Sequence, residues 1–256
     1  MTPLCAEALG LAGIGHAFFT RAGGVSEGVF AGLNCSLGSG DDPAKVVENR
    51  RRALDALGLA PDALVTGYQV HGTDVARVVN VWRHEDRPRV DGLVTRAPGI
   101  ALGILTADCA PVLLADPAVP VVAAAHAGWR GAIGGVVEAT LAAMEQAGAA
   151  RRRIAAAIGP CIGGRSYEVG PEFPAPFLAE NAANVRFFGP SPRAGHFLFD
   201  LGAYLEAKLR GLGLARVERI AADTCADAER FFSYRRACLR GESQFGHLLS
   251  VIALAP

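Results

Sequence analysis

Apolar residues along the chain fall mainly into short runs, which are separated by glycine, proline, asparagine and aspartate. Short apolar runs between such turn-forming residues are typical of buried β-strands. We therefore expect strands within the segments 64–70, 75–81, 91–95, 99–109, 112–116, 119–126, 154–158 and 217–221.

The period of the apolar positions changes in three segments, which we interpret as helices. The first extends from about Pro43 to Leu57, because proline suits the first helical position and Gly58 can end the helix. Asp41 and Asp42 offer an N-cap. The other two helices are expected over residues 131–146, before Gly148, and over residues 201–209.

Strands and helices do not alternate strictly, which counts against a simple doubly wound parallel sheet. No repeat, low-complexity segment or linker rich in Ser, Gly or charge divides the sequence. The economical interpretation is an α/β fold in which residues 1–256 form a single domain of mixed β-sheets flanked by helices.

Charge and hydropathy narrow the range of partners. The 256 residues include 25 Lys and Arg against 25 Asp and Glu, so no excess positive field attracts nucleic acid. No apolar run reaches the roughly 18 to 20 residues that cross a bilayer, and we expect no membrane role. Because the N-terminal segment lacks the basic region of a signal peptide, we predict a cytoplasmic protein.

Six cysteines are scattered without a CxxC pair, which makes reduced thiols the default. Cys109 has a particular setting. If the next two strands pair antiparallel about a turn centred near Pro117 and Ala118, Cys109 and His126 lie side by side at the open end. Zinc binds thiolate and imidazole at about 2.0 to 2.3 Å, and a catalytic site typically has three protein ligands. The hairpin therefore predicts two of them.

The third ligand has to come from elsewhere in the chain. His71 is the best candidate, because it follows an apolar strand and lies in a glycine-bearing turn, where a side chain can project into a cleft. His16, His84 and His196 have weaker settings. A rival interpretation makes Cys109 a nucleophile whose thiol pKa is lowered by His126. Asp108 could then orient the imidazole.

Two arginines near turns and helices suggest anion binding, although less strongly than the histidines and Cys109 suggest a metal site. The segment Gly128-Trp129-Arg130-Gly131 leads into a helix, so its amides and Arg130 could receive an anion, although a plain turn explains the glycines equally well. Arg50 lies on the first expected helix and is by default a solvated charge.

Several longer motifs, in this order, resemble the YfiH or laccase-domain family, also called multicopper polyphenol oxidase-like. That family includes purine nucleoside phosphorylases and the peptidoglycan editing factor. The resemblance covers nearly the whole chain. Its motifs are HAFFTRAGGVSEG at 16–28, LNCSLGSGDDPAKVVENR at 33–50, QVHGTDV at 69–75, DGLVT at 91–95, TADCAPVLLAD at 106–116, AAHAGWRG at 124–131, AIGPCIGGRSYEVG at 157–170 and DTCADAERFFSYRR at 223–236.

The resemblance implies a layered α/β/β/α sandwich and assigns roles to individual residues. It implies that His71, Cys109 and His126 bind Zn²⁺, with copper as the alternative metal. It also implies catalytic roles for Cys109 and Arg50, with Arg50 binding phosphate or substrate. We expect Gln69 and Arg130 to bind substrate. The chain departs from the family at His247, where relatives commonly have arginine, so the resemblance assigns no role to this position.

The activity that the resemblance implies is phosphorolysis of purine nucleosides, namely adenosine, inosine, guanosine and methylthioadenosine, with deamination of adenosine as a second reaction. The expected partners are therefore a purine nucleoside and phosphate. Candidates for the general acid are Asp74, Asp91 and Asp108. Two other functions stay open: copper-dependent oxidation of polyphenols, for which six histidines are few, and cysteine-dependent hydrolysis of cell-wall precursors.

Overall fold

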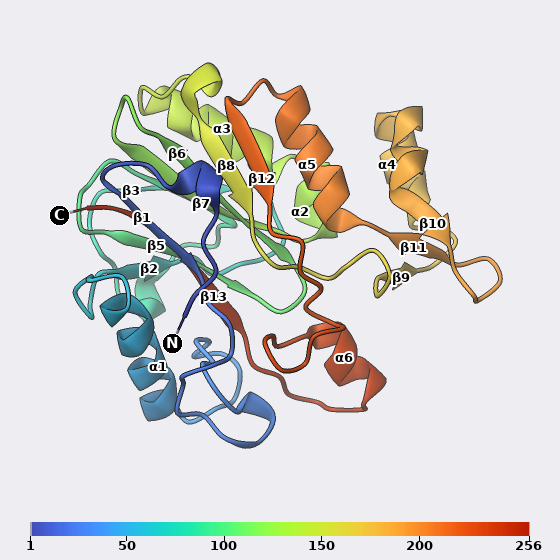
Figure 1. Ribbon diagram of the computed structural model, residues 1–256, viewed down its shortest axis with the longest axis horizontal. Helices are drawn as coiled ribbons and strands as arrows, with labels where there is room; N and C mark the ends of the chain where they lie inside the picture. Colours follow the sequence, from blue (N-terminus) through green and yellow to red (C-terminus); the bar gives the residue numbers. More distant parts are fainter. Residues whose placement is uncertain (1, 256) are drawn as a thin grey trace.

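Two β-sheets lie face to face at the centre of the molecule, with helices on both outer sides (Figure 1). The computed structural model describes residues 2–255. Helices α3 (Val136–Gln146) and α5 (Leu201–Gly211) cover one sheet, and α1 (Pro43–Asp55) covers the other. The order of layers is therefore α/β/β/α, and the expected fold class is confirmed.

The larger sheet has six strands in the order β12-β8-β6-β7-β4-β3. It is mixed, because β12–β8 and β3–β4 pair in parallel while the inner pairs are antiparallel. Its strands are β3 (Val75–Val78), β4 (Gly92–Thr95), β6 (Ala110–Asp116), β7 (Val121–Ala127), β8 (Ala155–Ile158) and β12 (Arg216–Arg219).

The second sheet has the order β1-β13-β5-β2 and pairs the two ends of the chain with its middle. Side chains such as Leu113 and Ile252 meet between the sheets and are fully buried. Because both faces of the sheets are covered, inner strands such as β6 and β7 are buried along their whole length and are mainly apolar. The strands are β1 (Ile14–Phe18), β2 (Leu64–Thr66), β5 (Ala101–Thr106) and β13 (Leu248–Leu254).

Helix α1 begins as predicted, since the Asp42 side chain accepts a hydrogen bond from the amide of Ala44 and Pro43 follows it. The prediction of one continuous helix over residues 131–146 is wrong in one respect. Gly135 adopts a left-handed conformation (φ 99°) and divides this segment into α2 (Trp129–Gly134) and α3. No helix within residues 2–255 is long and apolar enough to span a membrane.

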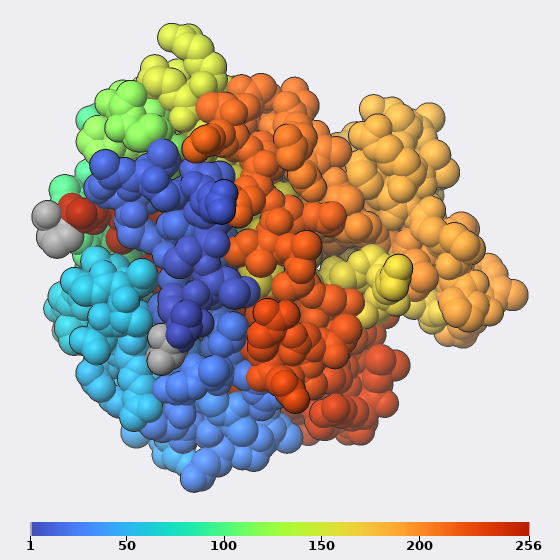
Figure 2. Space-filling view, in the orientation of Figure 1, coloured from blue at the N-terminus to red at the C-terminus, as the bar shows by residue number. Residues whose placement is uncertain are grey.

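A third sheet was not expected from the sequence. It has the order β10-β11-β9 and, with α4, forms a part that protrudes from the body of the molecule (Figure 2, light orange). These elements and the last helix are β9 (Glu168–Val169), β10 (Phe188–Pro190), β11 (Phe197–Phe199), α4 (Pro174–Glu180) and α6 (Tyr234–Leu239).

The hairpin of β6 and β7 forms, but its register differs from the one expected. His126 pairs with Pro111 rather than with Cys109, and the turn spans four residues, 117–120. Cys109 lies immediately before β6, after the bend at Asp108, and its thiol still lies close to the imidazole of His126.

Candidate metal centre

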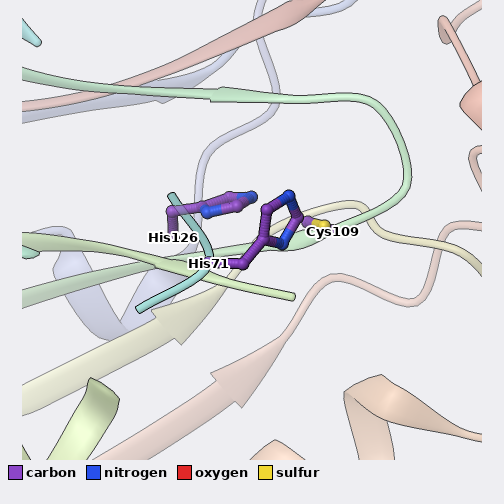
Figure 3. A group of neighbouring side chains, drawn as sticks. All are labelled: His71, Cys109 and His126. Atoms are coloured by element: carbon purple, nitrogen blue, oxygen red, sulfur yellow. The ribbon is translucent and has the colours of Figure 1, made fainter. Parts of the chain in front are cut away.

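His71, Cys109 and His126 converge from three separate segments of the chain (Figure 3). Their ligand-capable atoms all lie within 4.8 Å of one another, and the two imidazole ring centroids are 4.8 Å apart. His126 is buried, Cys109 is half-buried and His71 is exposed. Metal access is therefore from the side of His71.

The loop that carries His71 is held by one buried carboxylate. Asp91, at the start of β4, accepts backbone hydrogen bonds from Val70 at 3.0 Å, from His71 at 3.0 Å and from Gly72 at 2.8 Å. His71 itself has a positive φ of 59°, which is uncommon for a residue other than glycine. Three amide contacts to one charge stabilise this turn and thereby orient the imidazole.

The same carboxylate orients the second imidazole. Asp91 Oδ1 lies 2.7 Å from His126 Nδ1, so this ring nitrogen donates and Nε2 is left for a ligand. Burial raises the pKa of Asp91, but the hydrogen bonds from His126 and the amides outweigh burial and lower it. Asp91 is therefore a carboxylate at neutral pH.

Asp108 does not contact His126, so the expectation that it orients this imidazole is wrong. Its carboxylate accepts hydrogen bonds from Thr224 Oγ1 at 2.7 Å, Ser233 Oγ at 2.9 Å and the Arg235 amide at 2.6 Å. These bonds fix a residue with φ 86° immediately before Cys109. Asp108 thus positions the thiol through the backbone.

The thiol of Cys109 is ionised more easily than an ordinary cysteine. Burial raises its pKa, but the charge on His126 and hydrogen bonds from His126 and His71 outweigh burial and lower it to about 6. Burial lowers the pKa of His126, but the Cys109 thiolate and Asp91 outweigh burial, so the pKa of His126 is raised. By contrast, burial raises the pKa of Cys35 and of Cys161 to about 12.

Gly128 makes room for the cluster. A Cβ atom at this position would lie 2.6 Å from His71 Nδ1 and 2.9 Å from Cys109 Sγ, so no larger residue fits without displacing both. In a tetrahedral zinc site the ligand atoms are about 3.5 Å apart. The three donors therefore fit zinc after small side-chain adjustments, and the set of one thiolate and two imidazoles is one that zinc accepts.

The cluster opens into a cavity of about 630 Å³. Small-molecule sites typically enclose about 300 to 1,000 Å³. Aromatic and basic side chains predominate in the wall around the cluster, among them Tyr68, His84, Arg87, Trp129, Tyr234 and His247.

The comparisons with known proteins place this arrangement in a family. The family model described as multi-copper polyphenol oxidoreductase laccase matches residues 15–255. The chain belongs to this laccase-domain family. A purine nucleoside phosphorylase of Deinococcus radiodurans is 42% identical over 241 residues, which cover 93% of this chain and 88% of that protein. One of Streptomyces coelicolor is 43% identical over 220 residues, covering 86% and 88%.

Solved structures of the laccase-domain family share the fold. A protein of Neisseria meningitidis superposes with a TM-score of 0.89 at 32% identity, and the match covers 100% of both chains. The YfiH protein of Bacillus licheniformis gives a TM-score of 0.87 at 28% identity, covering 94% of this chain and 92% of that one. The resemblance first noted in the sequence motifs is confirmed.

The other predicted site residues of this laccase-domain chain differ in their settings. Gln69 lines the cavity, but its amide is paired with the backbone of Leu105 at 2.7 and 2.9 Å. Arg130 also lines the cavity, with its guanidinium 4.6 Å from the centre of the Trp129 ring. Arg50 is not a solvated charge, since its Nε donates to the Cys35 carbonyl at 2.8 Å and its Nη2 is buried.

The three candidates for the general acid lie in different places relative to the cavity. Asp108 lines the cavity, whereas Asp91 lies behind the cluster and Asp74 is exposed outside the cavity lining. Sequence reasoning missed the part that Asp91 plays, because 35 residues separate it from His126. The one available signal was that Asp91 begins a buried strand, where a carboxylate needs partners.

Proposed function

We propose that this chain is a zinc-dependent purine nucleoside phosphorylase. It converts adenosine, inosine, guanosine or methylthioadenosine and phosphate into the free base and ribose 1-phosphate, and it deaminates adenosine as a second reaction. The observation that carries the proposal is the cluster of His71, Cys109 and His126 at the wall of a nucleoside-sized cavity. The printed names of the relatives supply the substrate class.

Zinc is favoured over copper by the donor set. His71, Cys109 and His126 would hold zinc through one thiolate and two imidazoles, and three protein ligands are the usual number in catalytic zinc sites. Asp91 hydrogen-bonds the far nitrogen of His126, as carboxylates do behind zinc-bound histidines. Bound zinc would act as a Lewis acid and would lower the pKa of a water molecule toward neutrality, which is the chemistry that deamination requires.

Phosphorolysis requires positioning and charge stabilisation. A phosphate oxygen forms a bond to C1′ of the ribose while the bond from C1′ to the purine nitrogen breaks. The electron pair leaves with the purine, which then takes up a proton. Arginine side chains can hold the phosphate and stabilise this rearrangement of charge, and we assign this role to Arg50, with Arg130 and Gln69 contacting the nucleoside.

A cysteine-dependent hydrolase is the second candidate, and one observation favours it. The pKa of Cys109 is lowered to about 6, as in nucleophilic thiolates beside histidine. The same environment also suits a thiolate that binds zinc. A cysteine nucleophile requires only one histidine beside the thiol, and the second histidine beside Cys109 fits the role of a zinc ligand. Multicopper oxidation has less support, because it requires several metal ions. Residues 2–255, which the structure describes, contain a single cluster of three potential metal ligands.

One experiment separates these functions. Purified protein is analysed for bound metals and then incubated with adenosine, with and without inorganic phosphate. The proposal predicts bound zinc, adenine and ribose 1-phosphate that depend on phosphate, and inosine that does not. Stoichiometric zinc without any nucleoside turnover would contradict the proposed activity while leaving the metal site standing. A Cys109→Ser variant that keeps zinc and loses amidase activity would favour the hydrolase.

A further inference from the structure

Two histidines that line the cavity, and an arginine whose charge acts on one of them, have buried polar atoms that lack partners. Within residues 2–255, three buried nitrogen atoms without a hydrogen bond are Arg50 Nη2, His84 Nδ1 and His247 Nδ1. His84 and His247 line the cavity. A buried donor left unpaired destabilises the fold, so such atoms at and beside one cavity indicate a ligand that completes them.

Hydrogen bonds through Cys35 link Arg50 and His247, which are distant in the sequence. The carbonyl of Cys35 accepts from Arg50 Nε at 2.8 Å, and the amide of Cys35 donates to the carbonyl of His247 at 3.1 Å. The charge on Arg50 also acts on the pKa of His84. One short segment thus fixes Arg50 and His247 through their other atoms and leaves Nη2 and Nδ1 available.

Arg87 adds a second positive charge to this wall. Its Nη1 donates to the backbone carbonyl of His84 at 2.6 Å, and its guanidinium lies 5.2 Å from the centre of the Tyr68 ring. Both Arg87 and Tyr68 line the cavity. Arg87 is therefore held beside His84 and faces the same space.

The two imidazoles are neutral at physiological pH. Burial lowers the pKa of His84 to about 4, with Arg87 and Arg50 adding to the effect and Glu85 opposing it. Burial likewise lowers the pKa of His247 to about 4, with His126 adding to it. A neutral imidazole can carry its proton on Nδ1 and donate it to an oxygen. Two guanidinium groups and two such donors match an anion with several oxygens.

We propose that Arg50, Arg87, His84 and His247 form an oxyanion subsite that holds inorganic phosphate, with both imidazoles donating through Nδ1. The identification of the anion as the phosphate substrate rests on the proposed function. The same chemistry would accept the phosphate group of a nucleoside monophosphate, and the experiment below separates the two sources.

The test measures binding of inorganic phosphate to the zinc-loaded protein by calorimetry, without nucleoside. His84→Leu and His247→Leu remove the donors, whereas His84→Asn and His247→Asn keep an N–H close to the position of Nδ1. His196→Leu is the matched control, because His196 is half-buried, as are His84 and His247, and lies outside the cavity lining. Each lost hydrogen bond to a charged ligand is expected to weaken binding by roughly 10- to 100-fold.

The expected result is weaker phosphate binding in both leucine variants, recovery in both asparagine variants, and no change in His196→Leu. Zinc content should be equal in all five variants, which separates loss of the subsite from loss of the fold. In turnover, KM for phosphate should rise more than KM for adenosine.

Three outcomes would overturn the proposal: equal phosphate affinity in the leucine variants and the control, asparagine variants no better than leucine, or binding of adenosine monophosphate without binding of phosphate. If phosphate binds as expected but no nucleoside is consumed, the subsite stands and the proposed function fails.

Discussion

Asp91 and His126 are joined by a 2.7 Å hydrogen bond between Oδ1 and Nδ1, although 35 residues separate them in the chain. The same carboxylate accepts the amide hydrogens of residues 70–72. One buried charge therefore orients both histidines of the cluster. The geometry of the candidate metal centre depends on Asp91 as much as on the three donors.

Replacing Asp91 with asparagine should weaken zinc binding by roughly 10- to 100-fold. The asparagine amide would present either a donor to His126 Nδ1, which moves the ring proton to Nε2, or an uncharged acceptor. Competition with a chromophoric chelator measures the affinity. Asp74→Asn, an exposed carboxylate in the same turn, is the control and should bind zinc like the parent. Equal affinities of Asp91→Asn and the parent protein would show that the hydrogen bond does not support the metal.

Gly128→Ala should abolish tight zinc binding, because the added Cβ would lie 2.6 Å from His71 Nδ1 and 2.9 Å from Cys109 Sγ. Metal analysis after dialysis measures the effect. Gly211→Ala, at the end of α5, has no atom within 4 Å of the added Cβ and should retain zinc. Full zinc occupancy in Gly128→Ala would mean that the cluster in solution is wider than in this structure.

The pH dependence of Cys109 alkylation should reflect its lowered pKa. In the metal-free protein the reactive thiolate predominates above about pH 6, and the rate of iodoacetamide modification should fall as the pH drops through that value. Zinc should protect the thiol, and His126→Leu should raise its pKa. Peptide mapping distinguishes Cys109 from Cys161, the internal control whose pKa burial raises to about 12. A rate that climbs only between pH 8 and about 9, as for an ordinary thiol, would contradict this environment.

Leu113→Ala should destabilise the protein by about 2 to 5 kcal/mol, because this side chain is fully buried between the two sheets. The free energy of unfolding in urea is the measurement. Val79→Ala is the control, since Val79 is 62% exposed, and it should change the stability by about 0.5 kcal/mol or less. Similar losses in both variants would argue against the face-to-face packing of the sheets.

Local sequence patterns predicted the individual helices and strands of the core better than they predicted which elements pack together. The cap at Asp42 and the proline after it defined the start of α1, because both act within one helical turn. The break at Gly135 was missed, since the apolar positions continue across it. The protruding sheet was missed because its strands are two or three residues long, too short to show a period.

The candidate site was predictable where it depends on neighbours in a hairpin. Cys109 and His126 follow from the pairing of β6 and β7, even though the register differs by two residues from the expected one. His71 depended mainly on the family resemblance, with its glycine-bearing turn as the other indication. The roles of Asp91 and Gly128 emerge only in three dimensions, because the residues they contact lie far away in the sequence. The same holds for the nitrogens of His84 and His247, because only the fold shows that they are buried without a partner.

The zinc content and phosphorolytic activity of His71→Asn, measured beside the parent protein, test the proposed metal centre most sharply. Asparagine tolerates the positive φ of 59° at this position, so the turn is preserved while the imidazole ligand is lost. We predict one zinc ion per chain in the parent, with adenosine cleaved by phosphate. We expect little zinc and little activity in the variant. A His71→Asn protein that keeps both stoichiometric zinc and full activity would contradict the central claim.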